Sequence, residues 1–242
     1  MTALRTMVLA CALIAGSAPV AAQDQPETGT RLAAPKSRNL GSVAMTSKDQ
    51  AVGAKRFAEC LYNRKGSLAR QALLAPTPEV QGAAMNRLMG EISCFGVEMS
   101  NDLVGKRSVQ YPRDILRGML SETALSRDEQ RVAGLQPLPL QQIYQRNWFA
   151  ITGRHISVDE MAACIADTNP AGIFTLIGTI PTTKEEGAAF AGLGGNLHSC
   201  LRAGTKLQAS RQALRAALAD ALYQRLNAPT MTAAPVTEAA KK

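Results

Sequence analysis

The chain has 242 residues, carries a formal net charge of +8, and is 46% hydrophobic but only 4% aromatic. This length suits one large domain or two small ones, and the abundance of alanine and leucine favours closely packed helices. The positive charge is spread along the chain, which together with the scarcity of aromatic residues argues against nucleic acid as a partner.

Residues 1–22 have the form of a secretory signal peptide. Arg5 supplies the positive start, residues 7–20 form a short apolar run, and Val20-Ala21-Ala22 provides small residues for cleavage. The run is too short for a permanent membrane span. We therefore expect a periplasmic or secreted protein with no transmembrane segment in the mature chain. Residues 23–45 are predicted to be a disordered leader, because they lack apolar periodicity.

An internal repeat organises the middle of the chain. The pattern P-T-x4-G-A-A-x3-L-x-G begins at Pro76 and again at Pro181, and R-x-x-L-R-x-x-L begins at Arg113 and again at Arg211. Self-similarity in this order and spacing predicts two related structural units. We expect repeat 1 at residues 46–127, a linker at 128–154, repeat 2 at 155–227 and a disordered tail at 228–242.

Each repeat is expected to contain four helices. In repeat 1 these are 47–63, 68–74 after a turn at 65–67, a helix starting at Thr77-Pro78, and 112–125. The corresponding helices of repeat 2 are 157–167, 173–177, one starting at Thr183, and 210–226. Since no stretch alternates in the manner of a strand, the predicted fold class is all-α: two tandem four-helix units, each with one internal disulfide.

Local signals place the helix ends and the buried faces. Thr77 and Thr183 are predicted N-caps, and serines followed by Glu or Gln at the third position predict capping boxes. These serines are Ser47, Ser126 and Ser157. In the third helix of repeat 1, a four-residue spacing predicts one buried stripe. The stripe consists of Val80, Ala84, Leu88 and Ile92. The fourth helices are predicted to bury Ile115, Leu116, Met119 and Leu120 and, in repeat 2, Leu214, Ala217, Leu218, Ala221 and Leu222.

Four cysteines remain once the signal peptide, with Cys11, is removed. An even number in an exported chain predicts two disulfides, for which three pairings exist. Because each repeat should satisfy its own cysteines, we predict Cys60–Cys94 and Cys164–Cys200. A zinc site at the second pair with His198 has no counterpart in repeat 1, and no C-x-x-C motif is present. We therefore expect no metal and no cofactor.

Two pairs of arginines lie four residues apart, and each pair shares one helix face. They are Arg113 with Arg117, and Arg211 with Arg215. Such faces are candidates for binding an anionic partner. The simpler interpretation, which we favour, is a solvated face on which the arginines pair with nearby acids. Those acids are Asp114, Glu122 and Asp220.

The linker holds a cluster of aromatic residues, Tyr144, Trp148 and Phe149, that either docks a partner or packs the two units together. We favour packing. Gly192-Leu193-Gly194-Gly195 superficially resembles a phosphate-binding loop, but close helix packing explains Gly195 and its counterpart Gly90 more simply. No H-E-x-x-H or G-x-S-x-G motif occurs, whereas paired catalytic carboxylates would leave no local signature.

The segments 116–122 and 214–223 resemble a motif in uncharacterised exported bacterial proteins that share a paired-cysteine helical repeat. This resemblance implies no activity. We expect a non-enzymatic scaffold or interaction module of the bacterial envelope, whose partner is another envelope protein or an anionic envelope component. The alternatives are an envelope hydrolase without a sequence signature, and a binder of an anionic or apolar ligand between the two repeats.

Overall fold

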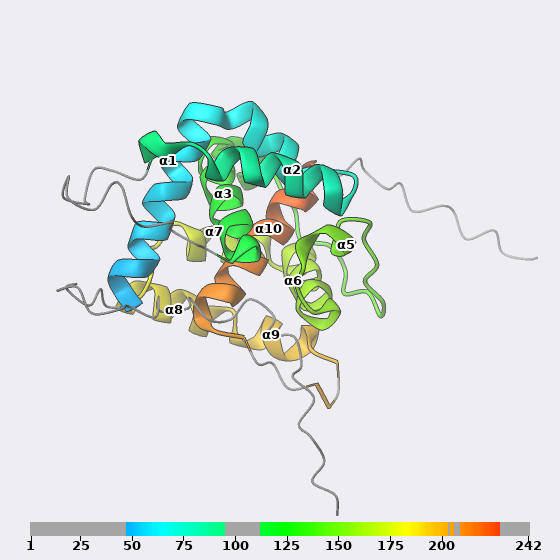
Figure 1. Cartoon of the computed structure of the whole chain (residues 1–242). Coiled ribbons are helices and arrows are strands. Elements are labelled where there is room, and N and C mark those ends of the chain that lie inside the picture. Colours follow the sequence, from blue (N-terminus) through cyan, green and yellow to red (C-terminus); the bar gives the residue numbers. More distant parts are fainter. Residues whose placement is uncertain (1–46, 95–111, 203, 206–208, 228–242) are drawn as a thin grey trace, which may run out of the picture.

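A computed structural model describes residues 47–94, 112–202, 204–205 and 209–227 (Figure 1). Within these ranges the chain forms ten α-helices, one 3-10 helix and no strand, which confirms the all-α class. The predicted signal peptide, leader and tail lie outside the described residues. None of the helices in the described ranges has the length and apolar character needed to cross a membrane.

The N-terminal half of the described chain, residues 47–127, contains four helices. They are α1 (Ser47–Leu73), α2 (Pro78–Met89), the 3-10 helix η1 (Ile92–Cys94) and α3 (Arg113–Arg127). The two parts of α1 run in different directions (Figure 1) because Lys65 departs from helical geometry, with φ −133° and ψ 40°. The break falls in the turn predicted at 65–67, so the two expected helices are present but joined.

The C-terminal half, residues 155–227, contains five helices, and two short helices lie between the halves. The five are α6 (Ile156–Thr168), α7 (Pro170–Ile177), α8 (Lys184–Gly192), α9 (Gly194–Cys200) and α10 (Arg211–Asn227). The connecting helices are α4 (Glu129–Ala133) and α5 (Phe149–Thr152). The third predicted helix is therefore divided in two at Leu193, which forms the junction between α8 and α9.

The threonine caps are confirmed, whereas two of the predicted serine caps are wrong. Thr77 accepts a hydrogen bond from the Val80 amide, and Thr183 accepts one from the Glu186 amide. Helix α6 is instead capped by the His155 ring, which accepts from the Ser157 amide at 3.3 Å. The Ser126 hydroxyl donates to the Glu122 carbonyl, one turn back in α3, and so caps nothing. The side chain of Ser47 lies outside the described set.

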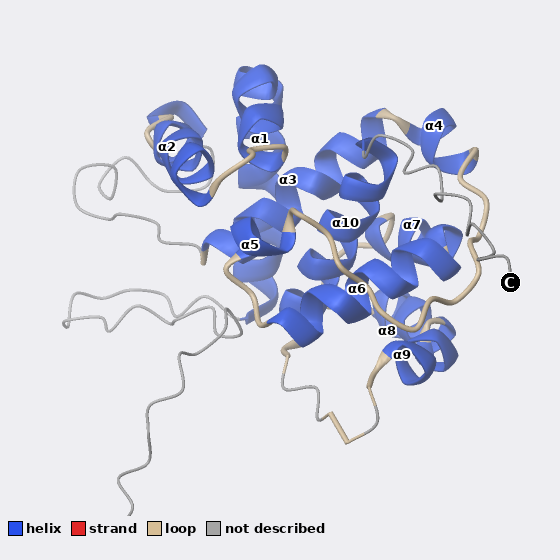
Figure 2. Ribbon diagram, turned by 90° about the vertical axis from the view of Figure 1, so that its right-hand side faces the viewer, coloured by secondary structure: helices blue, strands red, loops and turns tan. Residues whose placement is uncertain are grey.

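Helices α3 and α10 form the centre of the molecule, with α1 and α2 on one side and α6 to α9 on the other (Figure 2). The inward residues predicted for both helices are buried. The two backbones approach most closely at Gly118 and Ala216, where a Cβ on Gly118 would lie 2.3 Å from the Ala216 Cα. Only glycine fits this crossing, because a side chain would force the helices apart.

Two other predictions about packing are wrong. The predicted stripe is wrong at Val80, which is 36% exposed, whereas its Ala84 and Leu88 are buried and Gln81 and Met85 complete the buried face of α2. The side chain of Ile92 lies outside the described set. A helix has 3.6 residues per turn, so its buried face includes positions three and four residues apart. A spacing of exactly four residues therefore identifies only some of the buried positions. A Cβ added to Gly195 would have no neighbour within 4 Å, and one added to Gly90 would meet only the carbonyls of its own helix end. Close helix packing therefore explains neither glycine.

Both predicted disulfides are present. Cys60 is bonded to Cys94 across 34 residues and Cys164 to Cys200 across 36, with a Cα–Cα distance of 5.7 Å in each. The first bond ties α1 to η1, and the second ties α6 to the end of α9. Such bonds are typical of oxidising, non-cytoplasmic environments.

Candidate functional site

A network of buried charges lies between the two central helices. Arg215 of α10 is fully buried and clasps Glu122 of α3 with two hydrogen bonds, Nε–Oε1 at 2.7 Å and Nη2–Oε2 at 2.9 Å. Its Nη1 also reaches Glu186 of α8 at 3.0 Å. The remaining N–H groups donate to oxygens at the end of α7, namely those of Leu176, Ile177 and Thr179. Burial lowers the pKa of Arg215, but Glu122 and Glu186 outweigh it and hold the pKa above its ordinary value.

Arg117 of α3 occupies the corresponding place in the other half. It is fully buried, its Nε lies 2.7 Å from Asp220 Oδ2 of α10, and its terminal N–H groups donate to the carbonyls of Ala72 and Leu73 at the end of α1. Each central helix thus sends an arginine to an acid of the other. The two arginines also satisfy the open carbonyls at the ends of α1 and α7.

A second cation completes each cluster. Arg154 donates to Asp220 at 2.6 Å and to Asp159 at 2.7 Å, and Lys55 lies 3.2 Å from Glu122. Burial raises the pKa of Asp220, but Arg117 and Arg154 outweigh it and hold the pKa below its ordinary value. The acid therefore stays charged in the interior.

The arginine pairs do not form anion-binding faces or solvated faces. Arg113 and Arg211 are exposed, whereas Arg117 and Arg215 point into the core, where opposing acids already neutralise them. An i, i+4 spacing puts two residues on one side of a helix, but a helix at the centre of a fold buries more than one side. An anion-binding face and a solvated face are therefore both wrong for Arg117 and Arg215. Pairing with acids is confirmed, but the partners, Asp220 and Glu122, lie on the opposing helix in each case.

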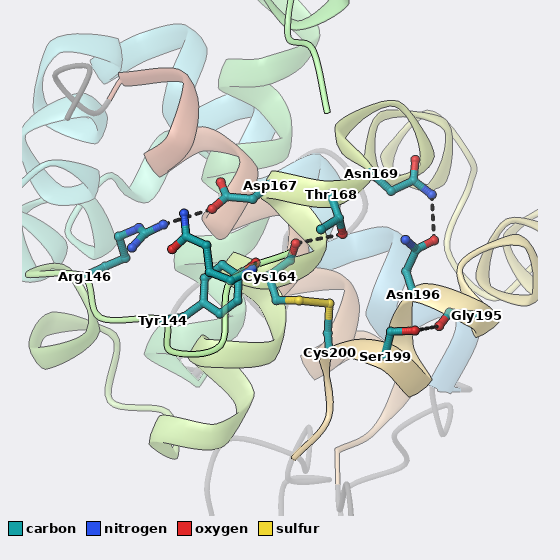
Figure 3. Close-up of a disulfide and its surroundings, with 11 residues drawn as sticks. Tyr144, Arg146, Cys164, Asp167, Thr168, Asn169, Gly195, Asn196, Ser199 and Cys200 are labelled. Atoms are coloured by element: carbon teal, nitrogen blue, oxygen red, sulfur yellow. Dashed lines mark hydrogen bonds and ion pairs between the residues drawn. A yellow bond between two sulfur atoms is a disulfide. The ribbon is translucent and has the colours of Figure 1, made fainter. Parts of the chain in front are cut away.

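The linker between the halves is held in a fixed course although residues 135–143 form no helix. The Leu138 amide donates to the Asp167 carbonyl at 2.7 Å, and the Gln141 amide donates to the Tyr144 hydroxyl at 3.1 Å. Arg146 pairs with Asp167 at 2.9 Å (Figure 3), and Arg225 of α10 hydrogen-bonds the Gln136 carbonyl. These contacts fasten the linker to α6 and α10.

Large apolar side chains project from this fastened linker. Leu140 is 58% exposed and Ile143 is 62% exposed, and Leu138 is also exposed. We define these three residues as the linker patch. Isolated exposed apolar residues are common, but three within six positions of a fixed segment make this segment a candidate interaction surface.

The aromatic cluster packs the linker onto the second disulfide. Tyr144 is buried against Ala163 and Cys164, with its ring beside the disulfide in Figure 3. Trp148 and Phe149 are half-buried against the same cluster and meet edge to face at 4.6 Å. Trp148 also touches the main core, and α5, which starts at Phe149, packs against α2. The cluster therefore packs the structure together, and Tyr144 is buried within it.

A hollow of about 310 Å³ lies beside the linker patch. Leu140, Tyr144 and both cysteines of the second disulfide line it, together with an ion pair between Arg202 and Glu160 at 2.9 Å. Because both cysteines are in a disulfide, they cannot act as thiolate ligands. Among the described residues no group of three metal-ligating side chains is found.

Sequence reasoning missed the linker patch and the second cation of each cluster. The segment Leu138-Pro139-Leu140 is predicted only as part of a connection, although apolar residues beside proline are a signal for a fixed, extended stretch. Arg154 lies in the same linker and offers no local signal, because its two acids are 5 and 66 residues away.

The fold and these contacts define an all-helical, disulfide-bonded protein with a neutralised ionic centre and an apolar linker surface. Comparison of the chain with protein-family models, with curated proteins and with solved structures finds no match.

Proposed function

We propose that this protein is a non-enzymatic interaction module of the bacterial envelope, built from two copies of one disulfide-stapled helical unit. The duplication is supported by the reciprocal contacts of Arg117 with Asp220 and of Arg215 with Glu122. In the repeat, Arg117 corresponds to Arg215 and Glu122 to Asp220. Each arginine therefore pairs with the corresponding acid of the other unit, as in a two-fold symmetric dimer. Gly118 and Ala216, also equated by the repeat, touch each other where such an axis would pass.

The observation that carries the interaction role is the linker patch. Its side chains remain exposed although hydrogen bonds and ion pairs fix the backbone that bears them. A fixed apolar surface loses little conformational entropy when a partner covers it, so it favours binding. The patch therefore suits a partner protein that offers an apolar face of its own.

The placement of the acids supports a non-enzymatic role over a hydrolase. Glu122, Asp159, Glu186 and Asp220 are fully buried in ion pairs. A pair of carboxylates that acts on a substrate must face a cleft, and one of the two must be free to give up a proton. The hollow beside the linker patch is lined by a single acid, Glu160, which is paired with Arg202.

Export to the envelope belongs to the same proposal. The two disulfides support an oxidising compartment, and the form of residues 1–22 supports export by a secretory route. A partner should therefore be sought in extracts of the native envelope.

Site-specific photo-cross-linking in such extracts tests the interaction role. A photoreactive amino acid is placed at Leu140 or Ile143 of the full chain, and at Ile180 as a control. Ile180 is 60% exposed and lies in the loop after α7, so it matches Ile143 in exposure but not in location. We expect one discrete cross-linked product from each of the two linker positions and none from Ile180.

Leu140→Asp and Ile143→Asp, each combined with a cross-linker at the other linker position, give the second readout. The aspartate should abolish the product without lowering the unfolding temperature, because both side chains are already exposed. The same products from Ile180, or none from the linker, would contradict the proposal, as would turnover of an envelope substrate by the purified chain.

A further inference from the structure

A second hollow, of about 340 Å³, lies on the central helices where α1 bends and where α3 and α10 end. Its polar lining comes from all three helices and from α4. The residues are Tyr62, Asn63, Arg70, Arg127, Asp128, Arg131, Tyr223 and Asn227. It shares none of these residues with the linker patch or the first hollow. Its volume lies within the range of small-ligand sites.

Two buried tyrosines face this hollow with unused hydroxyl groups. Tyr62 and Tyr223 are more than nine-tenths buried as whole residues, but their hydroxyl oxygens are not among the buried unpaired polar atoms of the described residues, so we take them to open onto the hollow that both residues line. Hydroxyls that open onto one hollow and make no hydrogen bond to a described residue can donate to a ligand there in place of water. Burial, with a smaller contribution from Tyr62, raises the pKa of Tyr223 to about 12, so its hydroxyl remains a donor at neutral pH.

The charges around the hollow favour an anion. Arg70, Arg127 and Arg131 contribute three positive charges and Asp128 one negative charge, so the lining has a net charge of two positive. Arg131 is partly engaged, with Asp128 at 2.9 Å and with the Leu226 carbonyl at 3.0 Å. Arg127 donates to Asn63 and lies over the Tyr62 ring. The side chain of Arg70 has no hydrogen bond or ion pair with the described residues.

Helix ends alone do not explain this arrangement. Arginines near the ends of α3 and α10 complement the helix dipoles, as Arg131 does at the Leu226 carbonyl. Arg70 likewise lies in the last turn of α1, so the helix dipole accounts for the arginines, but the tyrosine hydroxyls serve no helix end. Guanidinium groups and hydroxyls that converge with a surplus of two charges match the oxygens of a doubly charged phosphate.

We propose that this hollow binds a phosphate monoester group, with Arg70, Arg127 and the hydroxyls of Tyr62 and Tyr223 as its donors. The same chemistry is offered by free inorganic phosphate and by a lipid with a terminal phosphate. The site is independent of the linker patch, so either proposal can fail without the other.

Calorimetric titration of the full chain with inorganic phosphate tests the site, at about pH 8 where a phosphate carries nearly two charges. Vesicles containing phosphatidic acid, against vesicles of phosphatidylcholine alone, test the lipid source. Arg127→Gln should weaken binding about tenfold or more, and Tyr223→Phe about threefold to tenfold. Arg113→Gln is the matched control, because Arg113 lies at the other end of α3 and likewise donates to an asparagine, Asn86.

Saturable binding of phosphate that is weakened in Arg127→Gln and Tyr223→Phe, but is unchanged in Arg113→Gln, supports the proposal. Binding of phosphatidic acid vesicles only, with the same order of variants, supports it with a lipid as the source. No binding of either probe overturns the proposal. Equal weakening in Arg113→Gln and Arg127→Gln also overturns it, since this would reflect net charge alone. An unchanged unfolding temperature verifies that each variant is folded.

Discussion

The two buried arginines, Arg215 and Arg117, are placed alike but are neutralised differently. Each extends from a central helix, caps the carbonyls at the end of an outer helix and meets an acid of the opposing central helix. Arg215 clasps Glu122 with two hydrogen bonds and also holds Glu186, whereas Arg117 makes one bond to Asp220 and shares that acid with Arg154.

The difference extends to the first helix of each half. Five positions before the first cysteine, the N-terminal half has Lys55 and the C-terminal half has Asp159. Lys55 binds Glu122 directly, while Asp159 holds Arg154 against Asp220. Each cluster still contains two cations and two acids. An unpaired charge in the interior costs several kcal/mol, so each cluster must have no net charge. The two clusters reach this with different residues.

The largest expected effect comes from removing the arginine that holds two acids. Arg215→Met leaves Glu186 without a cation and Glu122 with Lys55 alone, so we expect a loss of about 5 kcal/mol in the free energy of unfolding. Arg117→Met should cost less, about 3 kcal/mol, because Arg154 still neutralises Asp220. Chemical denaturation of the purified chain measures both.

Arg211→Met is the control for this comparison, since Arg211 is exposed on the same helix as Arg215 and should change stability by less than about 0.5 kcal/mol. If Arg117→Met lowers the free energy of unfolding more than Arg215→Met does, then Arg154 does not compensate Asp220 for the loss of Arg117.

Loss of a disulfide should have the next largest effect. The two loops are 34 and 36 residues long, so the chain-entropy model gives about 4 kcal/mol for each bond. We therefore compare two double variants, Cys60→Ser/Cys94→Ser and Cys164→Ser/Cys200→Ser. Because they lose nearly the same loop-closure entropy, a difference in their stability reports the packing around each bond. We expect the second to lose more, because Cys164 is buried beneath Tyr144 while Cys60 is half-buried. Equal losses in denaturation experiments would mean that Tyr144 adds nothing.

A smaller effect is expected at the crossing of the central helices. Gly118→Ala places a Cβ 2.3 Å from the Ala216 Cα, so the helices must separate at a cost of about 1–3 kcal/mol. Adding Ala216→Gly should not restore stability, because the clash includes the Ala216 backbone as well as its Cβ. If the double variant fully recovers the unfolding temperature, the clash would involve only the Ala216 side chain and not its backbone.

The smallest effect concerns pH. Burial raises the pKa of Asp114, so at neutral pH its charged form is disfavoured in the folded chain. An acid with a raised folded pKa lowers stability above that pKa and has no effect below its unfolded pKa. Asp114→Asn should therefore stabilise the protein slightly at pH 7, and the gain should vanish in acid below about pH 4, near the unfolded pKa of an aspartate. Stability measured across pH that shows the opposite trend would contradict this assignment.

The sequence allowed prediction of features set by local pattern. The bend in α1, the threonine caps, the inward faces of α3 and α10 and both disulfides follow from spacing, capping residues and the repeat. The roles of Arg117 and Arg215 could not be read in this way, because their partners lie about 100 positions away on the other central helix. A repeated R-x-x-L-R-x-x-L pattern fixes which residues share a face, but not whether that face meets water or a second helix.

The candidate surfaces were predicted less well, for the same reason. The aromatic residues of the linker were singled out, yet the exposed side chains are its aliphatic ones. Tyr144 is buried because it packs on the Cys164–Cys200 disulfide, which joins segments that are distant in the sequence. The arginines of the second hollow come from α1, α3 and α4 and are brought together only by the tertiary packing of these helices.

Double-mutant cycles between the central helices test the central claim most directly. Arg215 and Glu122, and separately Arg117 and Asp220, are replaced by methionine singly and together, and the free energy of unfolding is measured. The reciprocal contacts of α3 and α10 predict a coupling energy of about 1.5–3 kcal/mol in both cycles. A coupling near zero in either cycle would contradict the claim that each central helix neutralises the arginine of the other.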